Sequence, residues 1–455
     1  MNEKTRHFIE TNLNADIRQL ALQGSKDPEV DLPLALRQIA GRQTARRKLP
    51  SWAALDGLLF PPHLNMEQCS SEQTARYKAD ICRRLLETLH KSPVTHHPSP
   101  FTSLIDLTGG FGVDFAWMSR AFDEATYVER DSELFAISSH NFGLVNFVNS
   151  VKTHNMDGID YLHQLSHATV IFLDPARRDD KGARTYGIAD CTPNVMEIKD
   201  ELLQKADIVI LKLSPMLDWR KAINDLGEQN VREVHIVSVQ NECKELLLVL
   251  SAMQPASPYV LFTINLLSDG TSQQFEVPSP STHHPSPLLS SLHLSPFTSH
   301  QHLYEPNASI MKAGCFQELA QHYSIQPLAP NSHLFVSDQY IADFPGRSFQ
   351  ISAISSMNKK ELKTVLSDIH SANITVRNFP LSVADLRKKL KLADGGNVYI
   401  FATTLANNQH VLIVCQVSGG GCPVREILEI TNESEITILF ADADRRDASL
   451  KPDLV

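Results

Sequence analysis

A glycine-rich turn bordered by carboxylates is the first stretch of this chain whose residue types could do chemistry. The run LIDLTGGFGVDF, residues 104–115, ends an apolar segment at Asp106 and places glycines at positions 109, 110 and 112. Glycine lets a backbone adopt positive φ and approach a ligand closely. The dinucleotide fingerprint G-x-G-x-x-G would need a further glycine at position 115, which is Phe115. The pattern that remains, D-x-x-x-G-x-G, weakens the case for a dinucleotide.

The acids beside this turn indicate the charge of its ligand. Asp106 and Asp114 flank the glycines, and carboxylates repel a pyrophosphate but attract a cationic amino-acid group. S-adenosylmethionine (SAM) carries an ammonium and a sulfonium. The turn therefore predicts a SAM site that includes Gly109, Gly110 and Gly112.

Two further acids follow the next two predicted strands. Glu129 ends the strand in ATYVERD, where a carboxylate can accept hydrogen bonds from ribose hydroxyls. Asp157 follows VKTHNM, where it could accept a hydrogen bond from an adenine amine. Either acid alone could equally be a helix cap. Three acids on three successive strand ends favour the cofactor site.

The fourth strand ends in VIFLDPARRD, where a donated methyl group would meet its acceptor. Asp174 could orient a nucleophilic amine or take its proton, and Pro175 fixes the local backbone. Arg177 and Arg178 could bind substrate phosphates or a carboxylate. They could also pair at the surface with the acids at 179–180, but their place at the rim of the sheet favours substrate.

Further basic residues and one cysteine have two interpretations each. Lys212, at the end of the next strand, could contact substrate or pair with Asp174. Arg387 and Lys388 belong to a basic cluster that could follow a phosphate backbone, as could a cluster at 42–48. Either cluster could also be a solvated helix face. Cys191 could be a pyrimidine-directed nucleophile, but an inert thiol is the simpler interpretation.

The elements that position these residues alternate between strand and helix. Short apolar runs separated by helical stretches predict a parallel, doubly wound sheet, with ligands at the carboxyl ends of its strands. Residues before 66 are expected to be helical. Ser70, with Gln73 three residues later, predicts the N-cap of the next helix. Beyond residue 349 the pattern predicts strand, helix, strand, helix and a final two-stranded hairpin around LANNQ.

Composition excludes several classes of protein. The 455 residues are 42% hydrophobic and 21% charged, which is typical of a globular chain with several domains. No apolar run reaches membrane-spanning length, and the N-terminus lacks a signal-peptide core, so we expect a cytoplasmic protein without membrane contact. Seven scattered cysteines indicate a reduced compartment and no structural zinc. The net charge of −10 disfavours general nucleic-acid coating but allows a local basic face.

The motifs in combination resemble a bacterial family of class I SAM-dependent methyltransferases. The resemblance is carried by DLTGGFGVD, VERD, NMDG, DPARRD and LKLSPMLD, by KLPSW and PPHLNMEQCSSEQTARYKA before them, and by YEPNASIMKAG and ISAISSMNKKELKTVL after them. It covers most of residues 30–420. It implies an α/β fold: a Rossmann-like, doubly wound methyltransferase domain, an N-terminal helical region, and small α+β ferredoxin-like and THUMP-like domains.

The domain boundaries that we predict are as follows. The helical region takes 1–66, the methyltransferase domain 67–270 with a Pro/Ser/His-rich insertion at 92–103, a low-complexity linker 271–300, the ferredoxin-like domain 301–348, the THUMP-like domain 349–425 and a polar tail 426–455.

The resemblance also implies a substrate, since THUMP domains generally present RNA to attached modification enzymes. A base of tRNA or rRNA would be methylated with SAM as cofactor and without a metal. By analogy, Asp106, Gly110 and Gly112 would contact the methionine end of SAM, Glu129 its ribose and Asp157 its adenine. The alternatives are a methyltransferase for a protein or small molecule, and a SAM- or RNA-binding protein without catalysis.

The catalytic motif of amine methyltransferases is matched in part. Asp174 and Pro175 occupy the first two positions of the tetrapeptide D/N/S-P-P-Y/F/W, which acts on exocyclic amines. Ala176 and Arg177 replace the second proline and the aromatic residue that stacks on the target base. A guanidinium can also stack on a base, so Arg177 could take that role.

Overall fold

The computed structural model describes residues 1–91, 101–145, 147, 149–177, 187–253, 259–278, 301–329 and 331–417. The predictions made for Arg178 and for the tail at 426–455 lie outside these residues, as do most of the 92–103 insertion and most of the linker at 271–300. Among the helices described, none has both the length and the apolar character needed to cross a bilayer.

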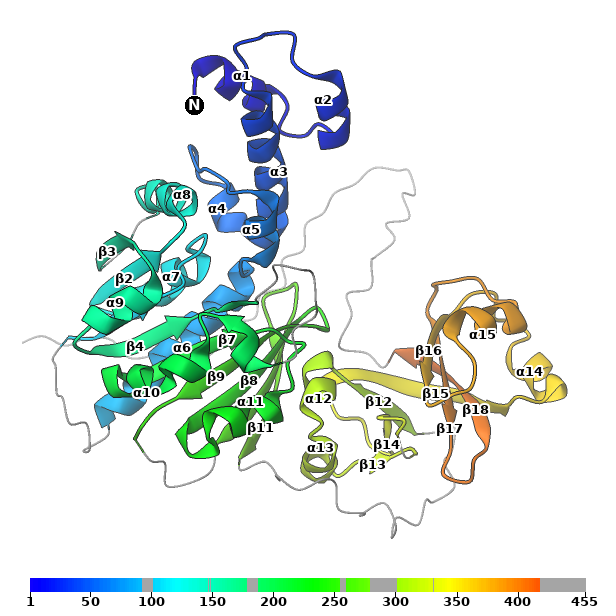
Figure 1. The fold of residues 1–455 in the computed structure, drawn as a ribbon. Coiled ribbons are helices and arrows are strands. Elements are labelled where there is room, and N and C mark those ends of the chain that lie inside the picture. Colours follow the sequence, from blue (N-terminus) through cyan, green and yellow to red (C-terminus); the bar gives the residue numbers. More distant parts are fainter. Residues whose placement is uncertain are drawn as a thin grey trace, which may run out of the picture. The chain divides into compact units, whose positions relative to one another are not determined.

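A nine-stranded sheet forms the centre of the first 278 residues, in the order β11-β10-β8-β9-β7-β4-β1-β2-β3 (Figure 1). Its strands are β1 (Ser103–Asp106), β2 (Glu124–Glu129), β3 (Ser150–Asn155), β4 (Ala168–Leu173), β7 (Ala206–Leu213), β8 (Val231–Val239), β9 (Glu242–Leu250), β10 (Val260–Leu266) and β11 (Ser272–Pro278). Strands β3, β2, β1, β4 and β7 are parallel neighbours. The predicted doubly wound, Rossmann-like domain is confirmed.

The sheet is not parallel throughout, because β9, a strand that was not predicted from the sequence, is antiparallel to both β7 and β8. Only Gln240 and Asn241 separate β8 from β9, and both have positive φ, 51° and 63°. Such a two-residue turn makes a tight hairpin and therefore reverses the strand direction. The structure also places β11 at 272–278, where the linker was expected to begin, as the antiparallel partner of β10.

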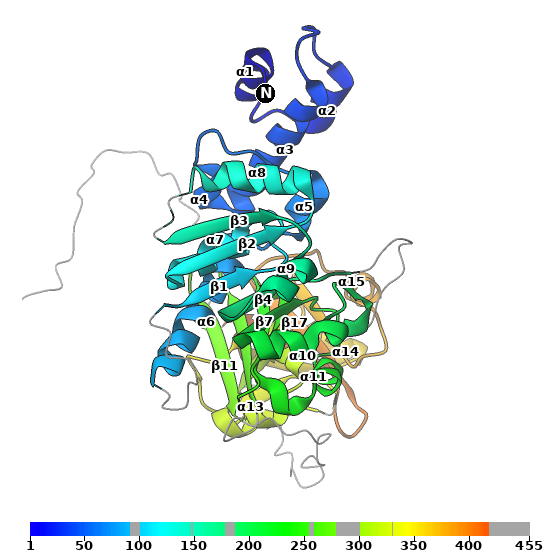
Figure 2. The same ribbon diagram turned by 60° about the vertical axis from the view of Figure 1, so that its left-hand side comes forward.

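Helices cover both faces of this sheet, and alternate strand residues supply the two cores. Helices α9 (Gly158–Gln164), α10 (Val195–Lys205) and α11 (Trp219–Leu226) lie together on one face (Figures 1 and 2). Ile171 of β4 packs in the core on that side. Helices α6 (Glu72–Lys91), α7 (Val113–Met118) and α8 (Ser132–Phe142) share the other core with Val170 and Phe172.

The N-terminal region is helical, as predicted. It contains α1 (Glu3–Thr11), α2 (Ile17–Gln23), α3 (Leu32–Lys48), α4 (Pro50–Ala53) and α5 (His63–Gln68). The predicted cap of α6 is wrong by one residue: the hydroxyl oxygen of Ser71, not that of Ser70, accepts the Thr74 N–H at 3.2 Å. Two adjacent serines offer equivalent caps, and Ser70 is buried in polar contacts of its own.

A second sheet of seven strands follows, in the order β13-β14-β12-β15-β18-β17-β16. Its strands are β12 (His302–Pro306), β13 (Gln326–Pro327), β14 (Phe335–Ser337), β15 (Gly346–Ser356), β16 (Asn373–Arg377), β17 (Val398–Thr404) and β18 (His410–Val417). Its helices are α12 (Ala308–Ala313), α13 (Phe316–Tyr323), α14 (Lys359–Val365) and α15 (Val383–Leu390). The element order from β15 onward is the predicted one.

Strand β15 joins the two predicted C-terminal domains. It pairs with β12 through residues 346–350 and with β18 from Phe349 onward. The sheet is therefore continuous, and the predicted boundary between residues 348 and 349 lies inside β15. The short elements of the chain are β5 (Ala176–Arg177), β6 (Cys191–Thr192) and the 3-10 helices η1 (Ser119–Ala121), η2 (Ile188–Asp190) and η3 (Glu228–Asn230).

Candidate active site

A cavity of about 750 Å³ opens at the carboxyl ends of the parallel strands. It brings together nine of the residues predicted from the sequence: Asp106, Gly109, Gly110, Gly112, Glu129, Asp157, Asp174, Pro175 and Lys212. Their convergence follows from the topology, because β1, β2, β4 and β7 are neighbours that end at the same edge.

Of the other predicted residues, Arg178 lies outside the residues that the structure describes. Arg177 forms the backbone ladder of β5 with Cys191 of β6, and Cys191 lines the cavity. Lys388 is exposed on α15. Its neighbour Arg387 donates hydrogen bonds to the carbonyl oxygens of Ala372 and Ala393, at 2.9 and 2.8 Å. Arg387 thus fixes a loop, and a substrate role for either residue stays a prediction.

The 42–48 cluster is also engaged in local structure. Arg42 donates to the carbonyl oxygens of Ala53 and Leu55, both at 3.1 Å. The ammonium of Lys48 donates to the carbonyl oxygen of Met66 at 2.9 Å. These two side chains therefore hold the segments that follow α3.

The three glycines of the turn are needed for different physical reasons. A Cβ at Gly109 would overlap the ring of Tyr127, and a Cβ at Gly112 would overlap that of Phe142. Gly110 has φ of +57°, and the nearest atom to its Cβ position is the Thr108 carbonyl oxygen at 3.7 Å. Gly109 and Gly112 therefore allow close packing, while Gly110 leaves open space at the cavity wall.

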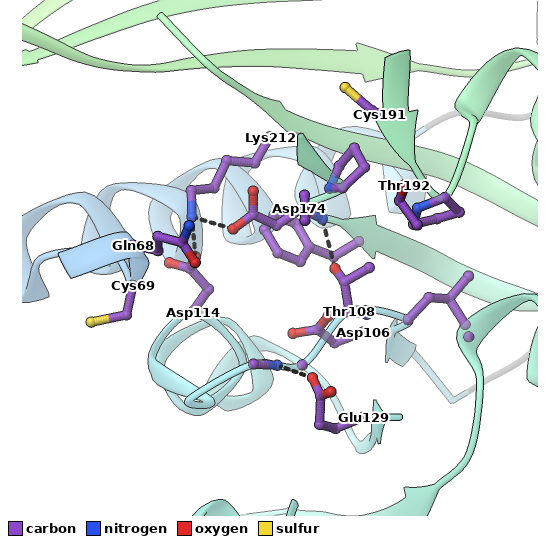
Figure 3. A pocket seen from close by; sticks show the side chains of 18 of the residues that line it. Gln68, Cys69, Asp106, Thr108, Asp114, Glu129, Asp174, Cys191, Thr192 and Lys212 are labelled. Carbon is purple, nitrogen blue, oxygen red and sulfur yellow. Dashed lines mark hydrogen bonds and ion pairs between the residues drawn. The ribbon is translucent and has the colours of Figure 1, made fainter. Parts of the chain in front are cut away.

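Glu129 ties the end of β2 to the glycine turn. Its Oε2 accepts the Gly110 N–H at 2.8 Å (Figure 3). Its Oε1 accepts the Asp131 N–H, also at 2.8 Å. Each carboxylate oxygen has a second lone pair, so the carboxylate can still accept hydrogen bonds from a ligand.

Asp157 is a helix cap that also lies at the cavity; its role toward adenine stays a prediction. It lines the cavity, and its Oδ1 caps α9 by accepting the Ile159 N–H at 2.8 Å. The adjacent Gly158, which the sequence analysis did not single out, is required because a Cβ there would overlap the Leu107 carbonyl oxygen.

Asp106 is a buried carboxyl that has no ion pair among the residues described. It is 1% exposed, and its Oδ1 accepts the Thr108 N–H at 3.0 Å. Burial raises the pKa of Asp106 well above its usual value, and the carboxylates of Asp114, Asp174 and Glu129 add to the effect. A cationic ligand would relieve this excess of negative charge. The residues at this end of the cavity thus fit the amino-acid part of SAM.

At the other end of the cavity, one ammonium lies between two carboxylates. Lys212 Nζ lies 2.5 Å from Asp174 Oδ2 and 3.4 Å from Asp114 Oδ2 (Figure 3). Burial raises the pKa of Asp174, and Lys212 offsets part of that rise. Burial alone would lower the pKa of Lys212, but Asp174, Asp114 and Glu245 raise it well above the usual value. Lys212 is therefore a cation near neutral pH.

A fully buried lysine extends this charge cluster. Lys78 is 0% exposed, and its Nζ lies 3.1 Å from Asp114 Oδ1 and forms an ion pair with Glu245. The Ser70 hydroxyl lies 2.7 Å from Asp114 Oδ2. Although burial opposes ionisation, Lys78 and Lys212 lower the pKa of Asp114.

Asp114 was predicted to be available to a cationic ligand, and the structure corrects this. Both of its oxygens face an ammonium of the chain, Lys78 on one side and Lys212 on the other. Of the two acids that flank the turn, Asp106 remains for the ligand.

The sequence analysis missed several members of the site. Lys78 falls on the buried stripe of α6 beside Ala75 and Ala79, and a lysine on such a stripe is the signal that was available. Asn65 and Gln68 of α5 also line the cavity, so the N-terminal region forms part of its wall. Other residues that were not assigned to the site from the sequence include Ser70, Thr108 and Gly158, which line the cavity, and Glu245, which pairs with Lys78.

Comparison with known proteins gives matches over most of the chain. A model of a THUMP domain-like family matches residues 346–417, and one of a ferredoxin-like domain matches residues 302–345. The solved structure of a methyltransferase from Porphyromonas gingivalis W83 is similar at 30% identity with a TM-score of 0.74; the match covers 92% of this chain and 99% of that one. Two proteins from strains of Mycobacterium tuberculosis, named as S-adenosylmethionine-dependent methyltransferases, are each 21% identical over 289 residues, which is 63% of this chain and 73% of theirs.

Proposed function

Because this chain belongs to the family of SAM-dependent methyltransferases that carry a ferredoxin-like and a THUMP-like domain, we propose that it methylates a base of structured RNA. The RNA would be a tRNA or an rRNA, and the THUMP-like domain would present it. SAM is the cofactor and supplies an activated methyl group.

The observation that carries the proposal is the division of one cavity into two electrostatic ends. At the first end, neither Asp106 nor Glu129 forms an ion pair among the residues described. At the second end, Asp174 is paired with Lys212 and its side chain is still 38% exposed. This division supports a cationic cofactor beside Asp106 and an uncharged methyl acceptor beside Asp174.

The residues of the cavity would contribute binding and orientation. Asp106 would pair with the ammonium of the cofactor, Glu129 would accept from its ribose hydroxyls and Asp157 would accept from its adenine amine. Asp174 would accept a hydrogen bond from the acceptor amine and take its proton. Alignment of an already activated methyl group with its acceptor is the main catalytic demand on such a site.

Support for RNA as the acceptor comes from the C-terminal part of the chain. The THUMP-like match includes α15, and Lys388 and Lys389 of that helix are exposed. Lysines of this kind can neutralise RNA phosphates. Arg177, which follows Asp174 and Pro175, would stack on the target base.

The test is methyl transfer from labelled SAM to RNA from a strain that lacks the protein. The expected result is labelling of that RNA by the wild-type protein, loss of labelling with Asp174→Ala, and little labelling of RNA from the parent strain, which is already methylated. Nucleoside mass spectrometry would then identify the modified base. A protein that binds SAM but labels only RNA-free extract is instead a methyltransferase for a protein or small molecule.

Catalysis and binding can also be separated in cells. If methyl transfer is the function, the Asp174→Ala strain and the deletion strain share one phenotype. A normal phenotype for Asp174→Ala would favour a binding protein without catalysis.

A further inference from the structure

We propose that Lys212 is a positioning residue, which holds the Asp174 carboxylate through Oδ2 and leaves Oδ1 to the N–H of the methyl acceptor. This inference rests on the proposed function, because it concerns the acceptor end of the same cavity. It assigns Lys212 to the protein's own machinery and not to substrate binding.

Asp174 is held at two points. Its backbone N–H donates to the Thr108 hydroxyl oxygen at 2.6 Å, and its Oδ2 accepts from Lys212 Nζ at 2.5 Å. Its Oδ1 has no hydrogen-bond partner among the residues described, and the side chain reaches the cavity. One oxygen is thus fixed by the chain while the other can accept from a ligand.

Lys212 is itself held from behind. Its side chain is 10% exposed and lies between Asp174 and Asp114. Asp114 is fixed in turn by Lys78, and Lys78 by Glu245. Charges of opposite sign therefore alternate along the cluster Glu245–Lys78–Asp114–Lys212–Asp174. An ammonium fixed between two carboxylates in a buried cluster is poorly placed to leave them for a substrate phosphate.

The role of such an arrangement follows from the chemistry of nitrogen methylation. As the acceptor nitrogen forms its bond to the methyl carbon, the sulfur–carbon bond breaks, and the nitrogen must lose a proton. An ionised Asp174 can take this proton directly or pass it to water. Lys212 favours the ionised form of Asp174 and keeps its free oxygen turned toward the acceptor.

The test compares Lys212→Met and Lys212→Arg with the wild type in the labelled-SAM assay, as a function of pH. Lys221→Met is the matched control, because Lys221 forms a 2.7 Å pair with Asp225 on the solvent side of α11. Without Lys212, burial raises the pKa of Asp174 with less opposition. We expect kcat of Lys212→Met to fall about 100-fold near pH 7 and to recover as the pH rises, since the acid limb moves upward. Lys212→Arg should restore part of the activity, and Lys221→Met should match the wild type.

Other outcomes would overturn the inference. A raised KM for the acceptor with unchanged kcat and an unchanged pH profile would make Lys212 a substrate-binding residue. Weaker binding of S-adenosylhomocysteine (SAH) by calorimetry, with no effect on the pH profile, would place Lys212 at the cofactor instead.

A second measurement needs no acceptor. The Tm of Lys212→Met, Asp174→Asn and the double variant forms a cycle that isolates the pair. Loss of Tm in Lys212→Met that is largely regained in the double variant is expected. Independent, additive effects would show that the two side chains are not coupled, and the inference would fail.

Failure of the proposed function would give different results from failure of the Lys212 inference. If the wild type labels no RNA, the RNA assignment fails, and the same pH comparison is made with RNA-free extract as acceptor. The Lys212 inference is then decided by the split between kcat and KM for that acceptor and by the Tm cycle.

Discussion

The ammonium of Lys212 lies 2.5 Å from Oδ2 of Asp174, so the ends of β7 and β4 are joined by an ion pair inside the cavity. Asp106, at the end of β1, has no such partner among the residues described, although it is more deeply buried. One end of the cavity therefore holds paired charges, and the other holds a carboxyl group that forms no ion pair among the residues described. This asymmetry is the basis for the proposal that the cationic cofactor binds at β1 and β2 and the acceptor at β4.

Replacement of Asp106 is expected to stabilise the folded protein and to weaken the binding of the cofactor. The pKa of Asp106 is raised by burial in the folded state, so the folded chain binds more protons than the unfolded chain between the two pKa values. The free energy of unfolding therefore falls as the pH rises through that window. Asp106→Asn removes this titration, and we expect its free energy of unfolding to exceed that of the wild type by about 1 kcal/mol at pH 8, with a smaller difference in acid.

The binding half of the same prediction is measured by calorimetry. We expect Asp106→Asn to weaken SAH binding by about 10- to 100-fold at pH 8, since a hydrogen bond to a charged group is lost. The affinity of the wild type for SAH should also decrease as the pH is lowered through the pKa of Asp106. The affinity of the variant for SAH should not change over the same pH range. An Asp106→Asn protein that binds SAH as tightly as the wild type would exclude Asp106 from the site.

Alanine substitutions at two neighbouring glycines should affect the protein for different reasons. Gly109→Ala would press a methyl group against the Tyr127 ring, and overpacking of this kind costs about 1 to 3 kcal/mol of stability. Gly110→Ala meets open space but has φ of +57°, so its cost should be about 1 kcal/mol.

The affinity for SAH should distinguish these two variants further. The added methyl group of Gly110→Ala lies at the cavity wall, so SAH affinity should fall more than stability does. Gly109→Ala should mainly lower the midpoint of urea unfolding. Equal losses of affinity and stability in both variants would contradict the distinct roles assigned to the two glycines.

Removal of the buried ammonium of Lys78 is expected to destabilise the protein strongly. Lys78→Met leaves Glu245 and Asp114 with one cation fewer in a buried cluster. Breaking a buried pair by removing one partner costs about 3 to 5 kcal/mol. Urea unfolding measures this loss, and the double variant Lys78→Met/Glu245→Gln should regain part of it. Lys152→Met, which breaks an exposed pair with Glu124, is the control and should change stability little.

Lys388 tests the contribution of the THUMP-like region to RNA binding. If Lys388 contacts a phosphate, Lys388→Ala should weaken RNA binding and reduce the salt slope of log K by about 1. SAH affinity should not change. Lys363→Ala, at an exposed position of α14, is the matched control. An unchanged slope for Lys388→Ala would remove this residue from the RNA surface.

The sequence predicts well those parts of the site that are local in the chain. Asp106 and Glu129 are the last residues of their strands, and Asp174 directly follows β4. Asp157 comes shortly after β3. Parallel strands end at one edge of a sheet, so the fold class alone brings these acids together. The glycines of the turn were also predicted because they are close together in the chain. Two of them, Gly109 and Gly112, allow packing against aromatic rings.

The sequence does not predict partners that tertiary structure selects. Lys78 and Glu245 pair across 167 positions of the chain, and no local pattern links a helix lysine to a strand glutamate. Asp114 appeared available because its two ammonium partners come from α6 and β7. Strand β9 itself was missed, since its turn, Gln240–Asn241, contains no glycine that would indicate a hairpin.

The most direct test of the cavity is calorimetric titration of the wild-type protein with SAH and, separately, with NAD⁺. The assignment predicts that SAH binds with one site per chain, that Glu129→Ala weakens this binding by about 10-fold or more, and that NAD⁺ gives no binding heat. Binding of NAD⁺ in the absence of any binding of SAH would contradict the assignment of the cavity to SAM.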